Sequence, residues 1–224
     1  MPTKTFIAVA LGTPILEVVS VQVKNFTGDT VSIGYQTLPG NQPQTYQNFV
    51  AIWQSSVIPW TAPPLKPPTP LKSNSQSGSL VLDGLTITRS TYVIGYGVGQ
   101  DISNICASAV LNAGGLMSPP SSVQIGINFV GTDAVSVNYQ TLSGYRPKTY
   151  KNWVGLWKGY ASPYTGGPPM GRADIPTDSS EGSVGINDVP MAINSNYTVI
   201  YFVGAEQTQA AAILSFNTAD FEKA

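Results

Sequence analysis

The side chains that carry most enzyme chemistry are scarce in this chain of 224 residues. It has no histidine and a single cysteine, Cys106. Ser–His and Cys–His mechanisms and the commonest zinc ligand are therefore excluded, and one cysteine forms neither a metal cluster nor an intrachain disulfide. Of the 12 carboxylates, several, such as Asp83 and Asp188, fall in expected turns. Nothing in their spacing selects a glycosidase pair. We expect no enzyme activity, no metal and no cofactor.

Cations and aromatic side chains are the candidates for binding. Four glutamines of the first half become cations 104 residues later, where Gln42, Gln44, Gln47 and Gln54 correspond to Arg146, Lys148, Lys151 and Lys158. This change indicates either a solvated surface that drifted or a site for an anionic partner, such as an acidic sugar, a lipid headgroup or an acidic protein face.

The aromatic candidates lie in or near two long segments rich in Pro and Gly, 54–77 and 158–181, which we expect to be loops without strands. They are Trp60, Tyr145, Tyr160 and Tyr164. Such rings stack on sugars or fill a partner's pocket. The alternative is that they pack the loops onto the body of the protein. With the four cations, they make up the predicted binding residues.

The elements that position these residues occur twice. Residues 31–53 read VSIGYQTLPGNQPQTYQNFVAIW, and residues 135–157 read VSVNYQTLSGYRPKTYKNWVGLW, at a constant offset of 104. Alternation of Val31, Ile33 and Tyr35, and of their counterparts Val135, Val137 and Tyr139, predicts strands with one buried face. About seven strands per copy and no convincing helical period predict an all-β fold of two tandem immunoglobulin-like sandwiches, residues 1–117 and 118–224.

The strand that closes each repeated stretch is apolar on both faces. Its sequence is FVAIW at 49–53 and WVGLW at 153–157. A strand of this kind is covered on both sides or presents one side to a partner. Either the two units pack on each other through these faces, or an aromatic sheet face is kept for assembly.

The last strand of each unit has a third relative near the N-terminus. ASAVL (107–111) and AAAIL (210–214) resemble IAVAL (7–11), and aligning the first two pairs Cys106 with Gln209. Residues 7–11 are then an extra edge strand on unit one, or a strand donated to a neighbouring molecule.

Composition limits the partners and leaves the location open. Charged residues make up 10%, hydrophobic residues 42%, and the net charge is −1. This balance predicts a folded chain that tends to associate and argues against nucleic acid as a partner. No apolar run is long enough for a membrane helix. The N-terminus mimics a signal peptide, but Gly12, Thr13 and Pro14 interrupt it. The cysteine content fits both a bacterial extracellular and a cytoplasmic location.

One motif resembles a known family. Residues 152–160, NWVGLWKGY, are similar to the Asp-Trp-Ile-Gly-Leu-Phe/Tyr motif of immunoglobulin- or fibronectin-III-like domains such as SKICH domains and the N-terminal domain of purple acid phosphatases. The first copy, NFVAIW at 48–53, lacks the Trp and the Gly, and Asn replaces Asp in both copies. The resemblance implies the fold and suggests binding; it implies no catalysis, because the motif residues are structural in those domains.

From the sequence we therefore expect a non-catalytic binding or assembly protein. It would use sheet edges and aromatic loop surfaces to contact another protein or itself. The alternatives are a carbohydrate-binding lectin that uses the long loops 54–77 and 158–181, and a secreted toxin or virulence accessory protein.

Overall fold

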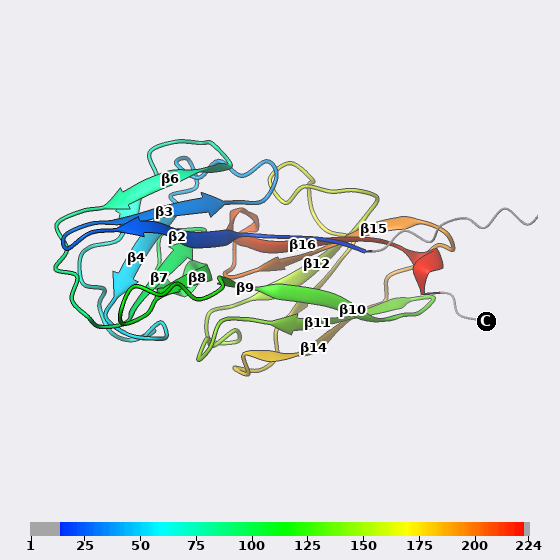
Figure 1. Cartoon of the computed structure of the whole chain (residues 1–224). Helices are drawn as coiled ribbons and strands as arrows, with labels where there is room; N and C mark the ends of the chain where they lie inside the picture. Colours follow the sequence, from blue (N-terminus) through cyan, green and yellow to red (C-terminus); the bar gives the residue numbers. More distant parts are fainter. Residues whose placement is uncertain (1–13, 222–224) are drawn as a thin grey trace, which may run out of the picture.

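The computed structural model describes residues 14–221 and shows two tandem β-sandwiches, which confirms the predicted fold class (Figure 1). Each sandwich consists of a three-stranded and a five-stranded sheet, and all strand pairs are antiparallel. Three short 3-10 turns accompany them: η1 (Ile102–Asn104), η2 (Gln207–Gln209) and η3 (Thr218–Asp220).

Unit one is the sandwich formed by the strands from β2 to β8. Its three-stranded sheet has the order β2 (Ser20–Phe26), β3 (Val31–Gln36), β6 (Ser77–Leu82). Its five-stranded sheet has the order β5 (Thr69–Pro70), β4 (Phe49–Trp53), β7 (Tyr92–Gly97), β8 (Ile105–Leu111), β9 (Ser121–Ser122).

Unit two, formed by the strands from β10 to β16, repeats this arrangement. The three-stranded sheet is β10 (Gln124–Val130), β11 (Ala134–Gln140), β14 (Glu181–Asn187). The five-stranded sheet is β1 (Ile15–Val18), β16 (Ala210–Asn217), β15 (Asn196–Phe202), β12 (Trp153–Lys158), β13 (Gly171–Asp174). The expectation that 54–77 and 158–181 lack strands was wrong: β5 and β13 lie inside them, and β6 and β14 begin at their ends.

The core follows the alternation of the sequence. The predicted inward sets of β3 and β11 are buried, from Val31 to Tyr35 and from Val135 to Tyr139. Each tyrosine of these sets lies near a tyrosine of the facing sheet, with ring centroids 5.7 Å apart for Tyr35 and Tyr96. The sheets therefore interdigitate as a sandwich requires.

The second apolar face of β4 is covered within the chain. Phe49, Ala51 and Trp53 form a buried cluster with Ile58 of the following loop and Leu142 of unit two. The aromatic faces therefore pack between the units, which is the first of the two alternatives drawn from the sequence. In unit two, Trp153 stacks on Phe202 of β15, with ring centroids 3.9 Å apart.

Two short strands cross from one half of the sequence to the sheet of the other half. Strand β1, before unit one, pairs with β16 of unit two, and β9, before unit two, pairs with β8 of unit one. The residues that follow them make equivalent bonds: Val19 N donates to Ala211 O at 3.2 Å, and Val123 N donates to Cys106 O at 2.9 Å. The units thus exchange strands reciprocally. The domain boundary predicted between residues 117 and 118 is not fixed by these pairings and stays a prediction.

These bonds correct the alignment of the last strands of the two units. Cys106 corresponds to Ala211, so pairing it with Gln209 was wrong. The ladders agree, because Tyr96 faces Ala107 while Tyr201 faces Ala212, an offset of 105. Alanine-rich strands match each other at several offsets, so sequence similarity cannot fix their alignment.

Residues 7–11 lie outside the described residues, and their role as an edge or donated strand stays a prediction.

Candidate functional site

Sheet edges expose unpaired backbone groups, and most edges of this protein carry a feature that discourages further pairing. Strands β2 and β10 contain a bulge. Strands β5 and β9 are two residues long, and Pro70 lies in the first of them. Charges protect two more edges: Arg172 and Asp174 on β13, and Glu17 on the four-residue β1.

The edges β6 and β14 differ from the rest. Neither of their ladders, to β3 and to β11, contains a bulge. Strand β6, SGSLVL, has no charge and no proline, and the Val81 side chain is 53% exposed. Within the described part of the chain, residues 77–82 make no hydrogen bond besides those to β3. Strand β14 has one charge, Glu181, at its first position.

A groove lies beside each of these two edges. In unit one a groove of about 430 Å³ crosses β2, β3 and β6, and in unit two one of about 450 Å³ crosses β10, β11 and β14. A glycine lines each groove and leaves room for a core tyrosine: a Cβ at Gly78 would lie 2.7 Å from the Tyr35 hydroxyl, and one at Gly182 would lie 2.9 Å from that of Tyr139, so a larger residue would make the tyrosine shift. The duplication therefore gives the molecule two equivalent sites, each with an open edge and a groove.

Two of the predicted aromatic residues contact the opposite unit. The Trp60 indole N–H donates to the Ser143 carbonyl at 2.9 Å, and its ring meets that of Tyr145 edge-on, with centroids 4.9 Å apart. Tyr164, the counterpart of Trp60 at the offset of 104, stacks on Tyr46 of unit one with centroids 5.4 Å apart. Each long loop thus places one ring against the other unit.

Tyr145 also belongs to this contact between units. It is 1% exposed, and its hydroxyl donates to the Ser103 carbonyl at 2.6 Å and accepts from Asn152 Nδ2 at 3.1 Å. Burial raises the pKa of the Tyr145 and Tyr164 hydroxyls. Of the four predicted aromatic residues, Tyr160 alone is largely exposed, at 74%. Sequence spacing could not reveal these contacts, because it does not show which loop meets which unit.

The four predicted cations do not form one patch. Arg146 pairs with Asp178 at 3.4 Å, while Lys148 and Lys151 are exposed in the same turn. Lys158 is the last residue of the six-residue strand β12, which puts it about 16 Å further along the strand direction.

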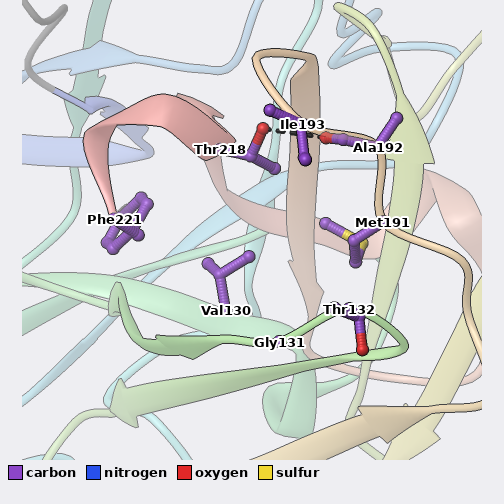
Figure 2. Close-up of a pocket in the computed structure, with 8 residues that line it drawn as sticks. All are labelled: Val130, Gly131, Thr132, Met191, Ala192, Ile193, Thr218 and Phe221. Atoms are coloured by element: carbon purple, nitrogen blue, oxygen red, sulfur yellow. Dashed lines mark hydrogen bonds between the residues drawn. The ribbon is translucent and has the colours of Figure 1, made fainter. Parts of the chain in front are cut away.

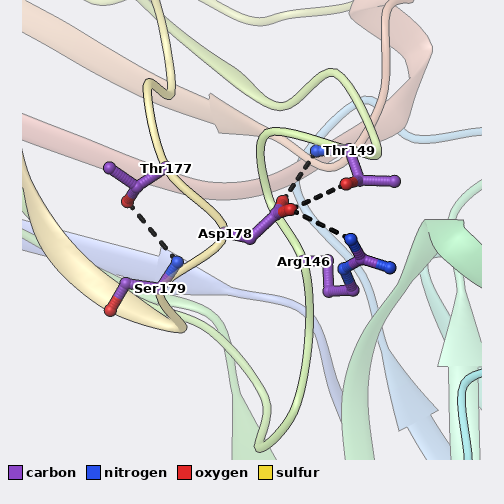
Figure 3. Close-up of polar contacts among 5 residues, drawn as sticks. All are labelled: Arg146, Thr149, Thr177, Asp178 and Ser179. Carbon is purple, nitrogen blue, oxygen red and sulfur yellow. Dashed lines mark hydrogen bonds and ion pairs between the residues drawn. The ribbon is translucent and has the colours of Figure 1, made fainter.

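Asp178 fixes the turn that carries Arg146 (Figure 3). Its carboxylate accepts from the Thr149 backbone N–H and from the Thr149 hydroxyl, both at 2.8 Å. These bonds, together with the nearby Arg146, hold the pKa of Asp178 below its ordinary value. In unit one Asn74 takes the same place and accepts from Thr45 N at 3.0 Å. The role common to both positions is to fasten the turn.

The cysteine and the carboxylates of the described residues lie apart from one another or are buried. Within residues 14–221 no three His, Cys, Asp or Glu side chains are grouped so as to hold a metal ion. Cys106 is fully buried, which raises the pKa of its thiol. None of the helical turns in the described region has the length and apolar character needed to cross a membrane.

Comparison with known proteins finds distant structural neighbours and no family. No family model matches the chain, and no curated protein is similar to it. A crystal structure of chicken CNTN1 FN1–FN3 domains aligns with a TM-score of 0.29 at 10% identity, over 85% of this chain and 60% of that chain. The two tandem V-type regions of VCBP3 (v-region-containing chitin binding protein) align with a TM-score of 0.26 at 12% identity, over 90% and 99%. Scores this low carry no argument about the fold or the function of this chain.

Proposed function

We propose that this protein is a non-catalytic assembly module that binds a second copy of itself through the edge of β6. The observation that carries the proposal is the contrast among the eight sheet edges of the described residues: seven carry a bulge, a charge or a very short strand, and β6 has none of these. An unprotected edge offers backbone N–H and C=O groups to an incoming strand, and the adjacent groove offers space for its side chains. The same chain already completes each five-stranded sheet with a strand from its other half.

Two copies of β6 would pair antiparallel about a twofold axis, since a self-complementary patch closes a dimer. Pairing of β6 with β14 of another copy would instead extend into a chain of molecules. The lectin and anionic-surface alternatives have less support, because Trp60, Tyr145 and Tyr164 contact the other unit and the four cations are divided between two places.

The test is the mass of the protein in solution as a function of concentration. We expect light scattering after size exclusion to show dimers or larger species for the parent chain. Val81→Lys should lower this mass to that of the monomer, because a charge at an exposed edge position opposes pairing. The matched control Val81→Thr keeps a β-branched, uncharged side chain and should assemble like the parent. A parent chain that stays monomeric up to about millimolar concentration would contradict the proposal.

A further inference from the structure

An apolar pocket opens at the end of unit two (Figure 2). Its volume is about 300 Å³, about that of ten water molecules. The turn between β10 and β11, the segment before β15 and the end of η3 line it, with Val130, Thr132, Met191, Ile193, Thr218 and Phe221. Of its polar groups, the Thr218 hydroxyl donates to the Ala192 carbonyl at 2.9 Å. Ile193 is 79% exposed.

In unit one a phenylalanine stands where the pocket has Val130. Phe26 pairs with Val31, and Val130 pairs with Val135, so the two positions are equivalent at the offset of 104. The Phe26 ring packs on the core beneath the loop that follows β8, and a Cβ at Gly115 would lie 2.8 Å from it. Unit two has a smaller side chain at this position.

The loop that covers Phe26 has no continuous counterpart among the described residues of unit two, where the segments 14–18 and 218–221 lie instead. In unit one, Leu111 bridges Met117 after the turn 112–116. At the equivalent place in unit two, the chain that follows β16 forms η3 and reaches Phe221. Strand β1 begins beside it, with Ile15 facing Ser215 of β16. Figure 1 shows the start of β1 and η3 at the same end of unit two. Ser215 and Thr218 are three residues apart, or about 10 Å in extended chain.

We propose that this pocket is the docking site for the protein's own N-terminal segment, Phe6-Ile7-Ala8-Val9-Ala10-Leu11. The segment is uncharged and apolar, as the pocket is. Three residues separate Leu11 from Ile15, and they span about 13 Å when extended, enough to reach the pocket. The covalent tether gives the segment an effective concentration of about millimolar, so at micromolar protein it prevails over the segment of a neighbouring molecule.

Cleavage of the full chain by chymotrypsin tests this docking, because the enzyme cuts after Phe6 and Leu11 when they are accessible. Val130→Phe introduces the residue of unit one and should fill the pocket. We expect this variant to be cut at Leu11 about tenfold faster than the parent, since cleavage follows the undocked fraction. Val130→Thr, which leaves the pocket open, should behave like the parent. Cleavage after Leu116, 72% exposed in unit one, is the internal reference and should not change.

A second variant on the segment itself removes any doubt about folding. Ile7→Ser with Val9→Ser leaves the sandwich unaltered and should also raise the cleavage rate at Leu11 about tenfold. Equal rates in the parent and both variants would overturn the proposal. Protection that grows with protein concentration would overturn the assignment to the same molecule. The experiment is repeated with Val81→Lys, so that loss of assembly through β6 and loss of docking are told apart.

Discussion

At the scale of single residues, a buried asparagine closes the polar network of each unit. Asn152 accepts from the Tyr201 hydroxyl at 2.9 Å and donates to the Tyr145 hydroxyl at 3.1 Å. In unit one Asn48 accepts from the Tyr96 hydroxyl at 3.1 Å. An ionised carboxylate at either position would have no N–H to donate and would place a charge in the core. This accounts for asparagine at the position where the resembling motif has aspartate.

Asp178 supports a prediction about pH, since Asn74 performs the same task without a charge. Because the folded-state pKa of Asp178 is lowered, its ionisation stabilises the fold above the unfolded pKa of about 3.9, and this contribution is lost as pH falls through the folded pKa. Asp178→Asn should keep the bond from the Thr149 N–H and donate its amide to the Thr149 hydroxyl, as Asn74 donates to that of Thr45, and so remove this pH dependence. Asp178→Ala should lower the Tm at pH 7. Thermal unfolding between pH 7 and pH 3 measures both effects.

The reverse change is the control for this prediction. Asn74→Asp in unit one should introduce the dependence on pH that Asp178→Asn removes. If the parent and Asp178→Asn lose the same Tm between pH 7 and pH 3, the carboxylate contributes nothing through its ionisation.

At the scale of elements, the sequence predicts the strands that bury one face or both. Alternation at Val31, Ile33 and Tyr35 located β3, and the apolar run 49–53 located β4. The strand β5 was missed because it has two residues and contains Pro70. The exchange of β1 and β9 was missed because pairing between distant strands depends on how the two units pack, which the order of residues does not state. For the same reason, nothing in the sequence separated the unprotected edge β6 from the others.

The loop aromatics lead to the second prediction, about the contact between units. Trp60→Ala removes a half-buried indole and its hydrogen bond to Ser143, and should lower the free energy of unfolding by about 2 kcal/mol. Tyr160→Ala, at an exposed position of the other long loop, should change it by less than about 0.5 kcal/mol. Urea unfolding followed by tryptophan and tyrosine fluorescence gives both values. Equal losses would mean that Trp60 does not hold the units together.

At the scale of the whole molecule, duplication and strand exchange produce an approximate twofold arrangement within one chain. Each unit receives a strand at the edge of its five-stranded sheet, β9 on β8 and β1 on β16. One place breaks the symmetry: unit one has a continuous turn at 112–117, while at the equivalent place unit two has the two ends of the described chain. The pocket beside Val130 is at that place, close to the first and last residues that the structure describes.

The third prediction follows from the closeness of β1 and η3, the first and last elements of the described chain. Joining Ala224 to Met1 connects Phe221 and Pro14 through 16 residues (222–224 and 1–13, 3 + 13), and the chain can then be opened between Gly114 and Gly115. Both glycines have positive φ, Gly114 is exposed and Gly115 is half-buried, and a cut between them leaves strands β8 and β9 unbroken. The permuted protein should fold with the circular dichroism of the parent and a Tm within a few degrees. A permutant opened between Val154 and Gly155, in the middle of the buried strand β12, should not fold. An unfolded first permutant would contradict the closeness of β1 and η3, and two permutants of equal stability would show that β12 does not need a continuous chain.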